Sequence, residues 1–393
     1  FGMNWSNYSR FVGDIFGAPL AMEGLLAFFL ESTFLGMWIF GWDRLPKKLH
    51  LASIWLAATG TVLSAYFILA ANAWMQHPVG YTMNAEKGRA ELTDIVAVLT
   101  QKTALATFTH TIAFAAFTAG AFMAGVSGWL LAKKRHEEVL KPTLKLGLIT
   151  VLISFLFVGV TGDWSARVMT EQQPMKMAAA EALYNTESGA PFSLLTIGTL
   201  DGSKSVFQIG VPNFLSFMST GDFNGTVEGI NDLQEKYVEE YGPGNYKPNI
   251  PLAYWGFRLM IGFGAIAFLF ALMTLYRLRK GSVPTGKWFV PAMVWMPFLP
   301  LLANSFGWIF TETARQPWTV FGLAKTEDGV SPQVGVTSLW ITLIGYVVLY
   351  GVLALIEVKL MLKAINIGPE ENVHYNEPTE IGGSSDKPLA MSY

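Results

Sequence analysis

Hydrophobic residues gather in seven long runs along the chain, with polar segments between them. A helix that crosses a membrane needs roughly 20 mostly apolar residues, and seven stretches satisfy this requirement. They are approximately Ala18–Gly41, Leu51–Met75, Thr103–Ala132, Thr143–Thr161, Pro251–Tyr276, Trp288–Thr311 and Thr337–Leu362. Seven buried helices of such length in a soluble protein would need a very large core. The pattern therefore predicts an all-α fold, a multi-span transmembrane helical bundle.

Lysine and arginine mark one side of the predicted spans. They fill the turns after the first, third and fifth spans and begin the tail after the seventh: Arg44, Lys47, Lys48, Lys133, Lys134, Arg135, Lys141, Arg277, Arg279, Lys280, Lys287 and Lys363. Because cytoplasmic loops carry an excess of positive charge, we expect these turns in the cytoplasm. Segments 1–17, 76–102, 162–250 and 312–336 are then expected outside.

Four parts follow from this arrangement. Residues 1–161 hold four spans, 162–250 form a long extracytoplasmic loop, 251–363 hold three spans and 364–393 form a polar cytoplasmic tail. The loop contains a helix-prone run, Met175–Leu183, and its later part is rich in Gly, Asn, Asp and Glu. This composition predicts an irregular surface flap.

The amino-acid composition excludes several classes of protein and of cofactor site. Charged residues make up 14% of the 393 residues and hydrophobic ones 52%, whereas soluble domains carry about 25% charged residues. A net charge of −2 argues against a strongly basic nucleic-acid binder. The absence of Cys excludes disulfides, iron–sulfur clusters and covalently attached c-type haem. A metal or haem would have to bind His, Met or carboxylate side chains.

His110 is the one histidine of five that lies well inside a predicted span. Met260 lies at a similar depth, roughly 10 Å from the outer end of its own span at 1.5 Å per residue. A His and a Met at matched depth can hold one iron from opposite faces, which gives a six-coordinate, low-spin haem. Arg258 could balance a haem propionate. The alternatives are a helix–helix hydrogen bond for His110, plain packing for Met260 and an Arg258 that reaches outward to the membrane surface.

Glu312 ends the sixth predicted span, and Arg315 follows on the same helical face. A carboxylate is a weak ligand that would leave a high-spin iron with an open position, as oxygen chemistry requires. The alternative is a simple ion pair between Glu312 and Arg315 at the membrane surface.

Two carboxylates, Glu23 and Glu31, share the first predicted span, roughly 12 Å apart in height on a regular helix. Ionisable groups in a membrane are costly and usually functional, so the two suit a proton relay. Ser64 and Asn72 on the next span could carry water beside it. Neutral carboxyls bonded to neighbouring helices are the alternative, and for Ser64 and Asn72 helix–helix bonding is the simpler interpretation.

Lys176 and Glu181 lie in the helix-prone run of the outer loop. Five positions place them roughly 140° apart on a helix, so both could reach a cleft without stacking on each other. The pattern alone favours a solvated amphipathic helix.

Several ordered runs resemble subunit I of the cytochrome bd quinol oxidases, from Phe1 to about Gly368. They are Phe1–Ser6, Gly13–Leu20, Glu23–Gly24, Phe28–Thr33, Gly41–Arg44, Ala71–Gln76, His110–Thr111, Gly256–Met260 and Arg315–Trp318. The resemblance implies nine spans in the full subunit, with two helices before Phe1, the first of which carries a His ligand of another haem. The seven visible spans would then belong to a chain that is incomplete at its N-terminus.

The resemblance implies six haem-site positions. They are His110 and Met260, the axial ligands of a low-spin haem b; Arg258 beside them; and Glu312, the carboxylate ligand of a high-spin haem, with Trp308 and Arg315 nearby. The family carries a high-spin haem b and a haem d in addition to the low-spin haem. Ala314 stands where the family has Gly, and we expect little effect from it.

The resemblance also implies a quinol site and a proton path. Lys176 and Glu181 match the quinol pair of the outer loop, called the Q-loop in this family, and this chain resembles the short-loop branch. Glu23 and Glu31 match the acidic residues of the proton path, with Ser64 and Asn72 at helper positions. Expected partners are a homologous subunit II, a small single-helix accessory subunit, membrane quinol and O2, in a bacterial plasma membrane.

The implied activity is quinol oxidation coupled to reduction of O2 to water. Electrons would pass through the low-spin haem to a high-spin pair, and a proton motive force would arise without pumping. Two alternatives remain: an ion-coupled transporter without haem, suggested by intramembrane carboxylates and the prolines at 291, 297 and 300, and a quinol oxidase with only b-type haem.

Overall fold

A computed structural model describes residues 4–199, 203–279 and 286–369. The expected polar tail lies largely in residues 370–393, outside the described residues. The described chain forms two compact units, one from residues 4–17 and 69–369 and one built on residues 18–68.

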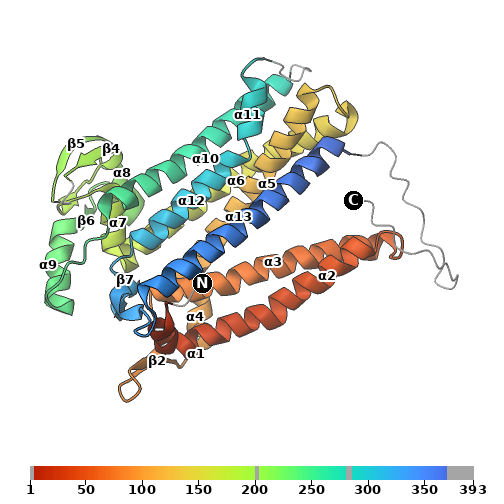
Figure 1. Cartoon of the computed structure of the whole chain (residues 1–393). Helices are drawn as coiled ribbons and strands as arrows, with labels where there is room; N and C mark the ends of the chain where they lie inside the picture. The colour runs from red at the N-terminus through yellow and green to blue at the C-terminus, as the bar shows by residue number, and fades with distance from the viewer. Residues whose placement is uncertain (1–3, 200–202, 280–285, 370–393) are drawn as a thin grey trace. The chain divides into compact units, whose positions relative to one another are not determined.

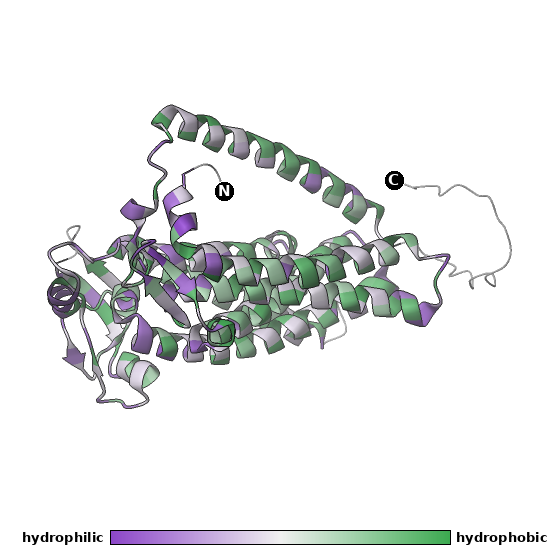
Figure 2. Ribbon diagram, turned by 90° about the horizontal axis from the view of Figure 1, so that it is seen from below, coloured by the Kyte–Doolittle hydropathy of each residue, from purple (hydrophilic) through white to green (hydrophobic). Residues whose placement is uncertain are grey.

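Within the described part of the chain, seven helical stretches are long and apolar enough to cross a membrane, as predicted. The first combines α1 (Ser6–Met22), a π-helical segment η1 (Glu23–Phe28) and α2 (Phe29–Phe40). The others are α3 (Lys47–Gln76), α5 (Lys102–Ala132), α6 (Glu137–Gln172), α10 (Ile250–Leu278), α11 (Phe289–Trp295) with α12 (Phe298–Thr313), and α13 (Val336–Ile367). Hydrophobic residues dominate these helices, whereas hydrophilic ones gather in the connecting segments (Figure 2).

Two predicted boundaries were wrong by more than ten residues. The first span begins at Ser6 rather than near Ala18, so most of segment 1–17 is helical. The fourth span was predicted to end at Thr161, but its helix continues to Gln172 through a polar segment. Arg167 Nε lies 2.9 Å from an Asp163 oxygen at i,i+4 spacing, a pair that supports a helix in water.

The π-helical segment also changes the expected placement of the two carboxylates of the first span. Glu23 begins η1, and Glu31 follows in α2. The estimated rise between them assumed a regular α-helix. A π-helical turn is wider than an α-helical turn, so that estimate does not apply.

The connecting segments contain more regular structure than the predicted irregular flap. After α7 (Pro174–Glu181) come β3 (Glu187–Ser188), β4 (Phe192–Gly198), β5 (Ser205–Val211), α8 (Phe214–Thr220), β6 (Thr226–Val227) and α9 (Ile230–Tyr241) (Figure 1). Strand β4 pairs antiparallel with β5, and β3 with β6. Aromatic and β-branched residues in β4 and β5, among them Phe192, Ile197 and Val206, favour strands, a signal hidden by the Gly- and Asp-rich segments around them.

The other connections are short. Segment 76–102 holds the hairpin of β1 (Tyr81–Asn84) and β2 (Arg89–Leu92), followed by α4 (Ile95–Thr100). The connection after α12 holds the hairpin of β7 (Trp318–Val320) and β8 (Ala324–Lys325), then the 3-10 helix η2 (Thr326–Gly329).

Helices α5, α6, α10 and α11 enclose the main core, where Phe117, Leu144, Leu148 and Met293 are fully buried. Glycines let the backbones of α5 and α6 approach. A Cβ atom at Gly120 would lie 2.9 Å from Gly147 O, and one at Gly147 would lie 2.8 Å from Ala124 N. Small residues at such crossings are how membrane helices pack closely.

We expect Gly147→Ala to lower stability by about 1–3 kcal/mol, because the added methyl group meets backbone atoms that cannot move easily. Gly262→Ala is the matched control, since nothing lies within 4 Å of its Cβ position in α10. Thermal unfolding of the purified complex in detergent compares the two. Equal melting temperatures would contradict the packing role of Gly147.

Candidate haem and quinol site

Two of the three predicted haem ligands share one cavity, which Glu312 does not line. His110 comes from α5 and Met260 from α10, and both line a cavity of ≈ 330 Å³. Its wall includes Gly159 and Gly162 of α6. Nothing lies within 4 Å of a Cβ placed at Gly159, so the missing side chain leaves open space there.

The imidazole of His110 is held by a neighbouring helix. His110 Nδ1 lies 3.1 Å from Thr161 Oγ1, and the Thr161 hydroxyl donates to Phe157 O at 2.7 Å. Because that hydroxyl proton is already used, Nδ1–H acts as the donor. This tautomer leaves the Nε2 lone pair available, the arrangement that orients metal-ligating histidines.

Lys176 also lines the cavity. Its Nζ donates to Gln76 Oε1 at 2.8 Å and lies 5.5 Å from the centre of the Phe310 ring. The residue is 4% exposed. Burial, followed by the nearby Arg315 cation, lowers the pKa of Lys176 to about 7, although Glu312 opposes this shift.

Glu181 stands at the other end of α7, and its partners differ from those of Lys176. Its Oε2 lies 2.5 Å from Arg258 Nη2 and accepts from Ser193 N of β4 at 3.0 Å. The residue is 1% exposed, and burial raises the pKa of its carboxyl while Arg258 opposes the shift. The structure thus gives the predicted pair two separate environments.

The expectation of a solvated amphipathic helix around Lys176 and Glu181 was wrong. Every residue from Met175 to Glu181 is buried. Ala179 and Ala180 pack against Ala253 and Phe310, because methyl side chains let this short helix approach its neighbours closely. The alanine run, which scores as merely helix-prone, was the signal for this burial.

Arg258 keeps spare hydrogen-bonding capacity. Its guanidinium lies 4.6 Å from the Phe192 ring centre and 4.9 Å from that of Tyr254. Nε and Nη1 are buried and have no hydrogen-bond partner within the described residues. Two unpaired cationic donors fit an anionic group such as a haem propionate.

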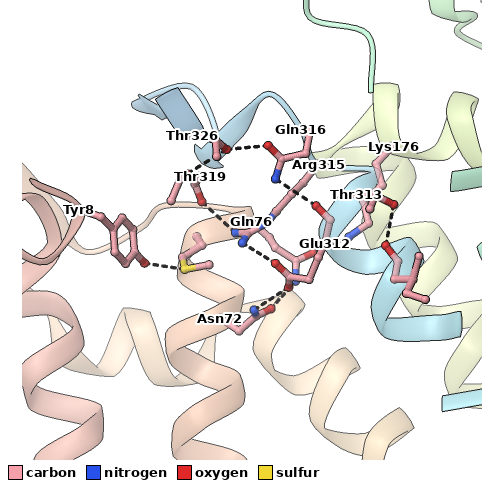
Figure 3. A network of polar contacts seen from close by, with 12 residues as sticks. Tyr8, Asn72, Gln76, Lys176, Glu312, Thr313, Arg315, Gln316, Thr319 and Thr326 are labelled. Carbon is pink, nitrogen blue, oxygen red and sulfur yellow. Dashed lines mark hydrogen bonds and ion pairs between the residues drawn. The ribbon is translucent and has the colours of Figure 1, made fainter. Parts of the chain in front are cut away.

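Glu312 and Arg315 form the ion pair that their spacing predicted. Glu312 Oε2 lies 2.5 Å from Arg315 Nη2, and Glu312 Oε1 accepts from Asn72 Nδ2 at 3.1 Å (Figure 3). The Glu312 side chain is 38% exposed, and an ionised carboxylate offers about four lone-pair positions, so it keeps capacity for a metal. Trp308 lies one turn earlier on α12 and is 37% exposed.

The predicted proton-path residues divide between the two units. In the unit built on residues 18–68, Ser64 Oγ donates to Glu23 Oε1 at 2.8 Å. Glu31 N would lie 2.7 Å from a Cβ at Gly60, so α2 and α3 touch there. Asn72 belongs to the other unit, where it contacts Glu312 and Gln76.

Comparison with known proteins identifies the family of the chain. Residues 1–369 match the family of cytochrome bd terminal oxidase subunit I. The chain belongs to that family. It is therefore a multi-pass membrane subunit of a haem-binding bacterial terminal oxidase, and membership removes the transporter alternative.

Individual relatives extend the match. The chain is 45% identical to cytochrome bd ubiquinol oxidase subunit 1 of Bacillus subtilis, over 96% of this chain and 81% of that protein. It is 31% identical to cytochrome bd-II ubiquinol oxidase subunit 1 of Escherichia coli, over 98% and 85%. The bd oxidase structure from Geobacillus thermodenitrificans superposes with a TM-score of 0.82 at 26% identity, over 93% of this chain and 82% of that one.

We expect Arg258→Met to destabilise this bd oxidase subunit by about 3–5 kcal/mol, because it leaves the Glu181 carboxylate buried without its cation. Lys102→Met is the control. Lys102 pairs with Glu171 at 2.9 Å, but both side chains are more than 60% exposed, so its loss should cost less than about 1 kcal/mol. Thermal unfolding measures both variants, and similar losses would argue against a buried pair at Arg258.

Proposed function

We propose that this chain is the haem-carrying subunit I of a quinol:O2 oxidoreductase. The observation that carries the proposal is the cavity shared by His110 and Met260, in which Thr161 orients the imidazole. His110 and Met260 would hold a low-spin haem b, with Arg258 donating to its acidic groups. Glu312 would bind a high-spin haem. When bound, the haems supply electron transfer and the reduction of O2 to water.

The quinol would bind from the outer side, between the two ends of α7. There the Lys176 ammonium donates a hydrogen bond to one quinol oxygen, and the Glu181 carboxylate accepts the proton released from the other. Two relatives above 30% identity are named ubiquinol oxidases, and a 27% identical Bacillus subtilis protein is named a putative menaquinol oxidase. Membrane quinol is therefore the proposed substrate class.

Protons for water would travel from the cytoplasm along Glu31 and Glu23, with Ser64 as a donor to Glu23. The Lys- and Arg-rich turns favour a Q-loop on the outer side, so quinol protons would leave on the opposite face. Charge then separates across the membrane without a pump. The proposed partners are a subunit II, which the designation "subunit I" implies, and a small accessory helix.

We expect His110→Ala to abolish the low-spin haem b band in the visible spectrum of the purified complex, because no second histidine lines the cavity among the described residues. His77→Gln, outside the cavity, is the control and should keep the band. An unchanged band in the His110 variant would refute the ligand assignment. A far-red chlorin band in the same spectrum would distinguish haem d from a b-only oxidase.

The lowered pKa of Lys176 predicts a pH dependence. The ammonium is present below about pH 7, so kcat/KM for quinol should fall as the pH rises through that value. Lys176→Arg keeps a cation at higher pH and should move this limb upward. Lys176→Met should raise KM about tenfold, the effect of losing one charged hydrogen bond. The nearby charged groups are Arg315 and Glu312. If the fall in kcat/KM occurs at the same pH in Lys176→Arg, a group other than Lys176 causes it.

A further inference from the structure

Gln76 connects the two halves of the site, although neither its position nor its residue type gave it a role. It is the last residue of α3 and is 6% exposed. Both ends of its amide are bonded: Oε1 accepts from Lys176 Nζ at 2.8 Å, and Nε2 donates to Asn72 Oδ1 at 2.7 Å (Figure 3). Its backbone oxygen accepts from Gln173 Nε2 at 2.7 Å, which fixes the start of α7 to the end of α3.

The contacts form a chain with one allowed direction. An ammonium group only donates, so the Gln76 atom beside Lys176 must be the oxygen. The Gln76 nitrogen then donates to Asn72, whose own nitrogen donates to the Glu312 carboxylate at 3.1 Å. Each donor points from the cation toward the anion, an alignment in which hydrogen bonds polarise and strengthen one another.

Gln76 is also the hydrogen-bond acceptor for a cation that has almost no water. Lys176 is 4% exposed, and leaving a buried charge without a partner is costly. Among the described residues, the Lys176 ammonium has one hydrogen bond, to Gln76, and lies 5.5 Å from the centre of the Phe310 ring. The position of the ammonium in the cavity therefore depends on the Gln76 oxygen.

We propose that Gln76 is a positioning residue that holds the Lys176 ammonium toward the quinol and couples it, through Asn72, to the Glu312 carboxylate. The inference rests on the proposed function, in which Lys176 binds quinol and Glu312 binds a haem. Gln76 also lines the cavity, and in this role it acts through its two neighbours, Lys176 and Asn72.

Two substitutions at this position separate the two bonds. Gln76→Met keeps the length of the side chain and removes both bonds. Gln76→Glu keeps an acceptor for Lys176 but cannot donate to Asn72, whose amide must then turn its oxygen toward Glu312. Gln76→Met should therefore impair quinol binding, whereas Gln76→Glu should preserve it and disturb the Glu312 end of the chain.

The test uses the complete oxidase with its partner subunit and a short-chain ubiquinol analogue. We expect Gln76→Met to raise KM about tenfold, with a smaller change in kcat. Lys176→Met should have a similar effect, and the double variant should be no worse than Lys176→Met, because Gln76 acts through Lys176. Gln76→Glu should keep KM within about twofold and shift the high-spin haem bands of the visible spectrum.

Gln101→Met is the matched control. Gln101 is 8% exposed, and its side chain donates one 3.3 Å hydrogen bond to Val98 O and bonds to neither Lys176 nor Glu312. Its KM and spectrum should stay unchanged. Independent, multiplying effects of Gln76→Met and Lys176→Met would overturn the inference, as would unshifted high-spin bands in Gln76→Glu. If Gln76→Met has a normal KM and Lys176→Met a raised KM, the inference about Gln76 is overturned and the proposed quinol role of Lys176 still stands. A normal KM in Lys176→Met would overturn both it and the proposed quinol role of Lys176.

Discussion

The burial of α7 with a charged residue toward each end is the constraint on which the site depends. A charge in a low-dielectric interior is tolerated only with a partner, and each of the two has one. Glu181 meets Arg258 of α10, and Lys176 meets Gln76 of α3. Because these partners come from separate spans, the contacts of Lys176 and Glu181 fix the C-terminal end of α3 and the N-terminal part of α10 relative to this short helix.

The alanines of α7 make this arrangement possible. With methyl side chains at positions 178–180, the helix packs against α10 and α12 without displacing larger residues. A small residue also leaves room beside His110, where a Cβ atom at Gly162 of α6 would lie 3.4 Å from the imidazole ring. Small residues thus place the polar groups close together, and hydrogen bonds fix their orientation.

Sequence patterns were sufficient for the spans, because 20-residue apolar runs depend on membrane thickness alone. The Glu312–Arg315 pair was likewise predictable from i,i+3 spacing. The alanine run was a signal for the burial of α7, but the partners of its two charged residues were not predictable, since a local pattern does not reveal a side chain that comes from a distant span. The roles of Gln76 and Thr161 were missed for a related reason. Each ends an apolar run, where a polar residue normally marks the membrane surface, and only the fold shows what its side chain contacts.

Strand β4 is attached to the site through the oxygen that holds Arg258. Glu181 Oε2 accepts from Ser193 N, and Tyr254 Oη accepts from Thr196 N at 2.7 Å in the same strand. A proton on Glu181 neutralises the carboxylate and weakens its bond to the strand. By thermodynamic reciprocity, a detached strand makes that carboxylate easier to protonate. Detachment of strand β4 and protonation of Glu181 are therefore thermodynamically linked, so each favours the other.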